Sequence, residues 1–292
     1  MRGNADQHAL VAPGSLGAVL DLLAAEPREW TPIAGGTELM VAFSAGRLKA
    51  RKLVSLWGIP DLQALRVTAD EVSIGAAATF LELRRQATIQ SDFPLLARAA
   101  GWIGSIANQS RATLGGNVVN GSPAADSSPA LLVYDAEVEA ISVRGSRRLP
   151  YSEFHTGYKR NVLAADELLY AIHLPRRFTE HRQYLRKVGT RRAMAIAKVA
   201  LAASARLERG TIREIRLGAA SLAPFPTRLR RTEEVLLGQA PMEETRRAAR
   251  SALLAEIAPI DDIRSNAIYR RRVAANLLEE FLLELGREEC RG

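Results

Sequence analysis

Residues 113–132 read TLGGNVVNGSPAADSSPALL, a run that joins a double glycine to a Ser-Pro-Ala-Ala-Asp sequence. The run lies in a longer segment, residues 103–129, which is rich in glycine, asparagine, serine and proline and shows no clear period. A loop of this length inside a compact domain is usually disordered or functional. Because the segment also contains isoleucine, valine, leucine and alanine, we predict an ordered binding segment rather than a disordered one.

A second double glycine lies near the start of the chain, in the sequence Ala34-Gly35-Gly36-Thr37. Paired glycines let backbone N–H groups turn toward an anion, because no Cβ blocks its approach. Side chains beside the two glycine pairs can also donate to a phosphate oxygen, namely those of Thr37, Thr113 and Asn117. A single Gly-Gly is more often a tight turn. Two Gly-Gly pairs in segments of similar composition favour a site that binds both phosphates of a dinucleotide.

Asp126 follows the second glycine pair, and two roles for it are open. It could cap the N-terminus of the helix that we predict over residues 129–134, or it could accept hydrogen bonds from ligand hydroxyls. The two roles are compatible.

The overall composition excludes several classes of protein. The chain has 292 residues, of which 47% are apolar and 25% charged, an ordinary globular balance that argues against a disordered or fibrous protein. Cys290 is the only cysteine, so an internal disulfide, a cysteine-ligated iron–sulfur cluster and a zinc ribbon are excluded. The sequence also lacks G-x-G-x-x-G, G-x-x-x-x-G-K-[ST] and G-x-S-x-G motifs, and its four histidines have no metal-ligand spacing.

The net charge of +8 arises from 40 basic and 32 acidic residues, and only five of the basic residues are lysines. A basic surface can bind nucleic acid. However, the arginine pairs are scattered and lack interleaved aromatic residues, so we favour solvated arginines and predict no nucleic-acid partner. The sequence has no run of about 20 apolar residues and no apolar signal segment, from which we predict a soluble, cytoplasmic protein without a membrane partner.

Hydrophobic periodicity predicts mixed helices and strands, with strands followed by helices in the second half. We expect a helix after Ser15 and another from about Thr79, and a polar linker over residues 176–181. The remaining expected helices cover residues 129–134, 242–257 and the region from 265 onward. The expected strands cover residues 31–34, 52–56, 72–76, 137–143, 147–149, 167–175, 183–188, 196–207 and 212–220.

These motifs resemble those of the FAD-binding subunits of molybdenum hydroxylases, the family of xanthine dehydrogenase, aldehyde oxidoreductase and carbon monoxide dehydrogenase. The family's A-G-G-T-[DE]-L pattern corresponds to residues 34–39, its T-[LIV]-G-G-N pattern to residues 113–117, and its S-P-x-[AS]-D-x-x-P-x-L-L pattern to residues 122–132. Further matches are Asp166–Leu169, a K-x-x-x-R-R-x-x-x-I-A-x-V segment that starts at Lys187, and Tyr269-Arg270-Arg271. Met194-Ala195 departs from the acidic residues that many members carry, and Gly121 replaces the usual alanine.

The resemblance implies an α+β fold: a two-part FAD-binding region of the vanillyl-alcohol-oxidase/PCMH type, followed by a C-terminal α/β layer domain of the carbon monoxide dehydrogenase flavoprotein type. The FAD-binding region would cover residues 1–177, with subdomains at about 1–57 and 58–177, and the C-terminal domain residues 182–288. It also implies FAD contacts, with no catalytic residue and no metal ligand in this chain. Leu169 and Lys187 would lie near the flavin, although Lys187 could equally be a surface lysine of a strand. The residues implied to bind FAD are Ile33, Ala34, Gly35, Gly36, Thr37, Glu38, Leu39, Thr113, Leu114, Gly115, Gly116, Asn117, Asp126, Leu169 and Lys187.

The function implied by the resemblance is electron transfer within a hetero-oligomer. A large subunit would bind molybdopterin, a small subunit would carry [2Fe-2S] clusters, and electrons would pass through FAD on this chain to NAD⁺ or another acceptor. Two alternatives stay open: a non-catalytic module that binds an anion or nucleic acid, and a stand-alone FAD oxidase. The oxidase is disfavoured because the chain offers no candidate thiol for a covalent flavin link and is too short for a substrate cap.

Overall fold

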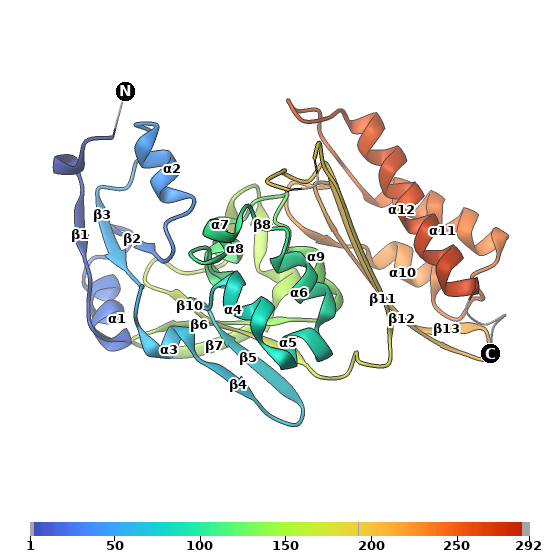
Figure 1. Ribbon diagram of the computed structural model, residues 1–292, viewed down its shortest axis with the longest axis horizontal. Coiled ribbons are helices and arrows are strands. Elements are labelled where there is room, and N and C mark those ends of the chain that lie inside the picture. Colours follow the sequence, from blue (N-terminus) through green and yellow to red (C-terminus); the bar gives the residue numbers. More distant parts are fainter. Residues whose placement is uncertain (1–2, 192, 288–292) are drawn as a thin grey trace.

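The computed structural model describes residues 3–191 and 193–287; Arg192, Cys290 and the predicted domain end at residue 288 lie outside them. The described part of the chain contains four sheets, of three, five, two and four strands. In Figure 1 the chain passes from a blue N-terminal lobe through a central lobe to an orange and red C-terminal lobe.

The N-terminal lobe is a three-stranded parallel sheet in the order β1-β3-β2, with β1 at Ala9–Val11, β2 at Trp30–Ile33 and β3 at Lys52–Ser55. Helix α1 (Leu16–Ala25) begins as predicted after Ser15, whose side chain accepts a hydrogen bond from the Ala18 amide at 3.3 Å. It buries Val19, Leu20 and Leu23 against the sheet. The lobe also contains η1 (Ala5–Gln7), α2 (Leu39–Ser44) and α3 (Pro60–Gln63).

The central lobe is built on a five-stranded antiparallel sheet in the order β4-β5-β10-β6-β7. Its strands are β4 (Leu65–Val67), β5 (Glu71–Gly75), β6 (Glu137–Ser142), β7 (Gly145–Pro150) and β10 (Leu168–Pro175), which confirms the strands predicted in this region. The β8 (His155–Gly157) and β9 (Arg160–Asn161) hairpin is separate from this sheet. The short helices are α4 (Phe80–Arg85), α5 (Ala87–Asp92), α6 (Pro94–Ala100), α9 (Ser128–Val133) and η2 (Tyr151–Glu153).

Residues 103–129 are ordered as predicted, but they are not a long loop. They contain α7 (Ile106–Gln109) and α8 (Leu114–Asn120), which begin at the side-chain caps Ser105 and Thr113. The glycines and asparagines of α8 have weak helix propensity, which hides the helix from periodicity. The Thr113 cap and burial of Leu114, Gly115 and Val118 stabilise it.

The C-terminal lobe is a four-stranded antiparallel sheet in the order β11-β12-β13-β14. Helices α10 and α12 pack on it, α11 packs on those two helices, and α9 of the central lobe contacts β12, β13 and β14 (Figure 1). The predicted strands-then-helices layer is therefore confirmed. The strands are β11 (Arg182–Val188), β12 (Val199–Glu208), β13 (Thr211–Ala220) and β14 (Thr227–Arg228); the helices are α10 (Arg230–Leu236), α11 (Glu243–Glu256) and α12 (Ala267–Arg287).

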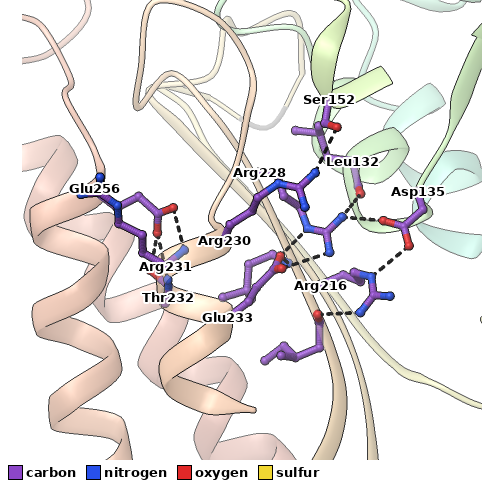
Figure 2. A network of polar contacts seen from close by, with 12 residues as sticks. Leu132, Asp135, Ser152, Arg216, Arg228, Arg230, Arg231, Thr232, Glu233 and Glu256 are labelled. Atoms are coloured by element: carbon purple, nitrogen blue, oxygen red, sulfur yellow. Dashed lines mark hydrogen bonds and ion pairs between the residues drawn. The ribbon is translucent and has the colours of Figure 1, made fainter. Parts of the chain in front are cut away.

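The connection between the central and C-terminal lobes, predicted as a polar linker over residues 176–181, contains two buried side chains. Phe178 is buried in the core of the central lobe, and His181 is buried with its Nδ1 3.0 Å from Ser204 Oγ on β12. Asp135, after α9, binds Arg177 at 2.5 Å, Arg216 at 2.9 Å and Arg228 at 2.5 Å. Figure 2 shows Arg216 and Arg228 converging on this carboxylate from the C-terminal sheet. The two lobes therefore share a polar interface.

Candidate functional site

A cavity of about 460 Å³ lies between the N-terminal sheet and the α8–β9 region of the central lobe. It is lined by 12 of the 15 predicted ligand-binding residues, whereas Leu114, Asp126 and Lys187 do not line it. Leu114 is fully buried in the core beneath α8. The lining residues are Thr31, Pro32, Ile33, Ala34, Gly35, Gly36, Thr37, Glu38, Leu39, Leu56, Ala76, Ala77, Ile103, Ala112, Thr113, Gly115, Gly116, Asn117, Val119, Asn120, Asn161, Leu163, Glu167, Leu168 and Leu169.

The first glycine pair presents unused backbone donors to this cavity. Within the described residues, the amides of residues 35–38 donate no hydrogen bond. Gly36 has a φ of 74°, in the left-handed region that glycine adopts at little cost. Four successive free amides at a turn form a concavity suited to an anion.

Gly35 is required for close packing of two backbones. A Cβ at this position would lie 1.6 Å from the carbonyl oxygen of Arg111, far inside any real contact distance. The guanidinium of Arg111 lies 3.8 Å from the ring centre of Trp57, which follows the cavity residue Leu56. The glycine therefore fixes the N-terminal lobe against the segment that leads into α8.

The second glycine pair has a different role from the one predicted for its backbone. Its amides already donate within the chain: Gly115 to Ala76 O at 2.8 Å, and Gly116 to Thr113 Oγ1 at 3.1 Å. Side chains provide the polar groups here instead. The Ser127 hydroxyl donates to Asn117 Oδ1 at 2.6 Å, which leaves the Asn117 NH₂ group as the donor available to a ligand.

Asp126 and Lys187 form a buried ion pair beside the cavity, with 2.6 Å between Oδ2 and Nζ. Their side chains are 11% and 10% exposed, so Lys187 is not a surface lysine, and Ser127 rather than Asp126 stands at the start of α9. Lys187 Nζ also lies 3.4 Å from Trp102 O, next to the cavity residue Ile103. Asp126 Oδ1 is buried without a hydrogen-bond partner.

Burial raises the pKa of Asp126 to about 6, although the Lys187 ammonium favours its ionised form. The orphaned Oδ1 atom is a buried acceptor whose hydrogen bond is unmade. A ligand hydroxyl or N–H group that donated to Oδ1 would remove the free-energy cost of burying this unpaired acceptor.

The cavity suits a ligand that has an anionic centre and a flat apolar part. The amides of residues 35–38 supply donors for the anion, while Ile33, Leu56, Ile103 and Leu169 supply apolar surface. A volume of this size is typical of cofactor and small-molecule sites. The residues present therefore fit a dinucleotide such as FAD.

Models of known families match the chain in two consecutive parts. Residues 6–177 match the FAD-binding domain in molybdopterin dehydrogenase, and residues 184–285 match the C-terminal domain of carbon monoxide dehydrogenase flavoprotein. The first match alone covers more than half of the chain. The chain belongs to the FAD-binding subunits of the molybdenum hydroxylases. It is an oxidoreductase subunit whose cofactor is FAD.

Relatives of this FAD-binding subunit match it along almost its whole length. The xanthine dehydrogenase FAD-binding subunit of Escherichia coli O157:H7 is 31% identical over 272 residues, which cover 92% of this chain and 93% of the relative. The carbon monoxide dehydrogenase medium chain of Hydrogenophaga pseudoflava is 27% identical, with coverage of 93% and 94%. A solved structure of carbon monoxide dehydrogenase from the same organism superposes with a TM-score of 0.91 at 26% identity and covers 96% of both chains. The family and the α+β fold inferred from the motifs are thus confirmed.

Several cavity residues of this FAD-binding subunit escaped the sequence analysis. Ile103 and Asn161 lie outside the quoted motifs, whereas Glu167 and Leu168 lie in the segment matched before Leu169. Only contacts between distant segments bring Asn161 to the cavity, so no local signal marks it.

The described residues hold no group of three or more histidine, cysteine or acidic side chains placed to bind a metal. Among those same residues, no helix is both long and apolar enough to cross a membrane.

Proposed function

We propose that the chain is the electron-transfer subunit between [2Fe-2S] clusters on a small partner chain and NAD⁺ or another acceptor. In this proposal a molybdopterin-binding large subunit oxidises the substrate. Support comes from relatives named for xanthine and carbon monoxide dehydrogenases and from the fit of the cavity to a dinucleotide. Bound FAD supplies reversible electron transfer, and the protein contributes binding, shielding and electrostatic tuning.

The observation that carries the proposed site is the row of free amides at residues 35–38. They would donate to the pyrophosphate, with Asn117 and the Thr37 hydroxyl as additional donors. Leu169 and Ile33 would shield the apolar part of the cofactor from water. Asp126 would accept a hydrogen bond from the cofactor at Oδ1, and Lys187 would hold that carboxylate in place and favour negative charge nearby.

We also propose the domain division at residues 1–177 and 182–288, with the first part divided near residue 57. The apolar cores support it, because the C-terminal core gathers β11 to β13 with α10 to α12, and the central core takes only Leu185 and Ala202 from those elements. We place the protein in the cytoplasm, where its partner subunits would assemble with it.

The first test is the absorption spectrum of the purified chain, followed by acid release and identification of the pigment. We expect FAD at about one per chain. Gly116→Val should lower FAD content, because a side chain there points toward Thr113 Oγ1 at the cavity wall and narrows the approach. A colourless chain that takes up no added FAD would contradict the site.

Electron transfer is tested by reconstitution with the two proposed partner subunits. We expect the flavin absorption band to bleach on addition of the substrate only when both partners are present, and to recover with the physiological acceptor. Bleaching by substrate without partners would favour a stand-alone oxidase. Flavin-free chain with strongly salt-dependent DNA affinity would favour the nucleic-acid alternative.

A further inference from the structure

The charged side chains that line the cavity have the wrong sign for an anionic ligand. Among the described residues that line it are two carboxylates, Glu38 and Glu167, but no lysine or arginine. Each carboxylate would repel a diphosphate unless a cation neutralised it. Acceptance of such a ligand therefore depends on cations that reach the lining residues from neighbouring elements.

Glu167 is neutralised by a fixed partner. Arg147 on β7 binds it through two parallel contacts, Nε to Oε1 and Nη2 to Oε2, each at 2.7 Å. The Ala164 amide also donates to Glu167 Oε2 at 2.7 Å, and the Glu167 side chain is only 9% exposed. This bidentate geometry is the strong form of an arginine–carboxylate pair.

Among the described residues, Glu38 pairs with one cation, which lies on a different lobe. Lys159 Nζ lies 3.1 Å from Glu38 Oε1, and the two side chains are 43% and 60% exposed. Lys159 belongs to the turn between β8 and β9, in the central lobe. The pair thus joins the first glycine loop, whose Glu38 lines the cavity, to this hairpin.

The β8–β9 hairpin is held in place by the end of α8. A Cβ on Gly121, the left-handed residue that ends α8, would lie 3.1 Å from Lys159 Cα, so the two backbones are in close contact. Asn161 Nδ2 donates to Val119 O at 3.4 Å, and both residues line the cavity. Lys159 therefore projects from an anchored turn at the cavity rim.

We propose that Lys159 is a further ligand-binding residue, which offsets the charge of Glu38 and so lets the cavity accept a diphosphate. The inference rests on the proposed FAD site and adds a residue that lies outside the glycine motifs. The amides of residues 35–38 are neutral donors, whereas the Lys159 ammonium neutralises the carboxylate of Glu38. The pair is exposed and contributes little to folding, so its role is tested by binding rather than by stability.

The test compares FAD dissociation constants of the full-length wild type, Lys159→Gln, Glu38→Gln and the double variant, measured with added FAD after removal of bound pigment. At about 50 mM NaCl we expect Lys159→Gln to weaken binding about tenfold, and at about 500 mM salt much less. Glu38→Gln should bind FAD about threefold more tightly, and the double variant should return to within about threefold of the wild type. Lys49→Gln is the matched control, because Lys49 is exposed and makes no ion pair among the described residues.

The inference is overturned if Lys159→Gln binds FAD as tightly as the wild type, or if the double variant stays as weak as Lys159→Gln. It is also overturned if the loss is equal at both salt concentrations. Circular dichroism checks the folding of each variant, and Glu38→Gln provides a readout that does not depend on the lysine variant. A wild-type chain that binds no FAD would instead refute the proposed function.

Discussion

Lys187 Nζ on β11 lies 2.6 Å from Asp126 Oδ2, so a buried ion pair ties the C-terminal sheet to the segment after the second glycine pair. The contact spans 61 residues of sequence. It brings together two residues for which the sequence implied the same ligand but no mutual contact. The C-terminal lobe therefore reaches the edge of the proposed FAD site.

Removal of one partner of this pair should lower the stability of the fold. Lys187→Met leaves the Asp126 carboxylate buried without a counter-charge, and we expect the free energy of unfolding at pH 7 to fall by about 3 kcal/mol. The measurement is urea unfolding of the flavin-free chain. In Asp126→Asn/Lys187→Met no charge stays buried, so most of the loss should be regained; a double variant no more stable than Lys187→Met would refute this account.

Two buried groups should give the stability opposite pH dependences over the same range. Burial raises the pKa of Asp126 to about 6 from an ordinary 3.8, so its contribution is present below pH 3.8 and is lost as the pH rises through 6. Burial lowers the pKa of His155 to about 4 from 6.5, so its contribution is present above pH 6.5 and is lost as the pH falls through 4. Each corresponds to about 3 kcal/mol.

Single variants should therefore separate the two pH dependences of the unfolding free energy, which act together in the wild type. His155→Phe keeps an aromatic ring against Tyr151 and Phe154, and its unfolding free energy should rise as the pH falls from 6 to 4. Asp126→Asn should show the opposite slope, measured by urea unfolding at several pH values. Equal slopes in the two variants would show that these groups do not titrate as their burial requires.

Asp135 should be a major contributor to the lobe interface at neutral pH. Its carboxylate binds three arginines, Arg177, Arg216 and Arg228. Burial raises its pKa, but Arg228 and Arg216, which Figure 2 shows beside it, hold the pKa below the ordinary value of 3.8. Asp135 has a φ of 49°, a conformation that asparagine also tolerates. Asp135→Asn thus removes the charge without straining the backbone.

We expect Asp135→Asn to lower the free energy of unfolding by about 2 kcal/mol at pH 7. The carboxylate's contribution is present above pH 3.8 and is lost below it, so wild type and variant should converge in acid. Asp21→Asn is the control, since Asp21 is exposed on α1 and makes no ion pair among the described residues. A constant difference between wild type and Asp135→Asn across this pH range would exclude the carboxylate charge as the cause.

The sequence predicts elements well where one face is buried over many residues. The Ser15 cap with its apolar spacing locates α1, and the long apolar stripe of the last helix locates α12. Short helices such as α2 and α8 were missed, because six or seven residues give too little periodicity and α8 contains two glycines. Capping and tertiary packing, rather than local pattern, stabilise them.

The glycine motifs predict most of the residues that line the cavity, but they do not predict the structural role of each glycine. Gly35 and Gly36 are tied to a close backbone approach and a left-handed turn, whereas Gly115 packs against Ala76. The approach of Lys159 to Glu38 joins positions 121 residues apart. No local pattern encodes such a pairing, so it emerges only from the folded lobes.

Gly35 should be more sensitive to an added methyl group than a glycine without close neighbours. Gly35→Ala puts a Cβ 1.6 Å from Arg111 O, so the two backbones must separate and the free amides of residues 35–38 must shift. We expect a loss of about 2 kcal/mol in unfolding free energy and a loss of FAD from the purified chain.

Gly17→Ala is the matched control for this substitution. Gly17 lies in α1, and a Cβ there meets no atom within 4 Å, so alanine should raise the stability by about 0.5 kcal/mol and leave FAD content unchanged. Thermal unfolding and FAD content of both variants provide the comparison. If Gly35→Ala retained wild-type stability and FAD content, the backbone contact with Arg111 could not be what sets the geometry of the amide row.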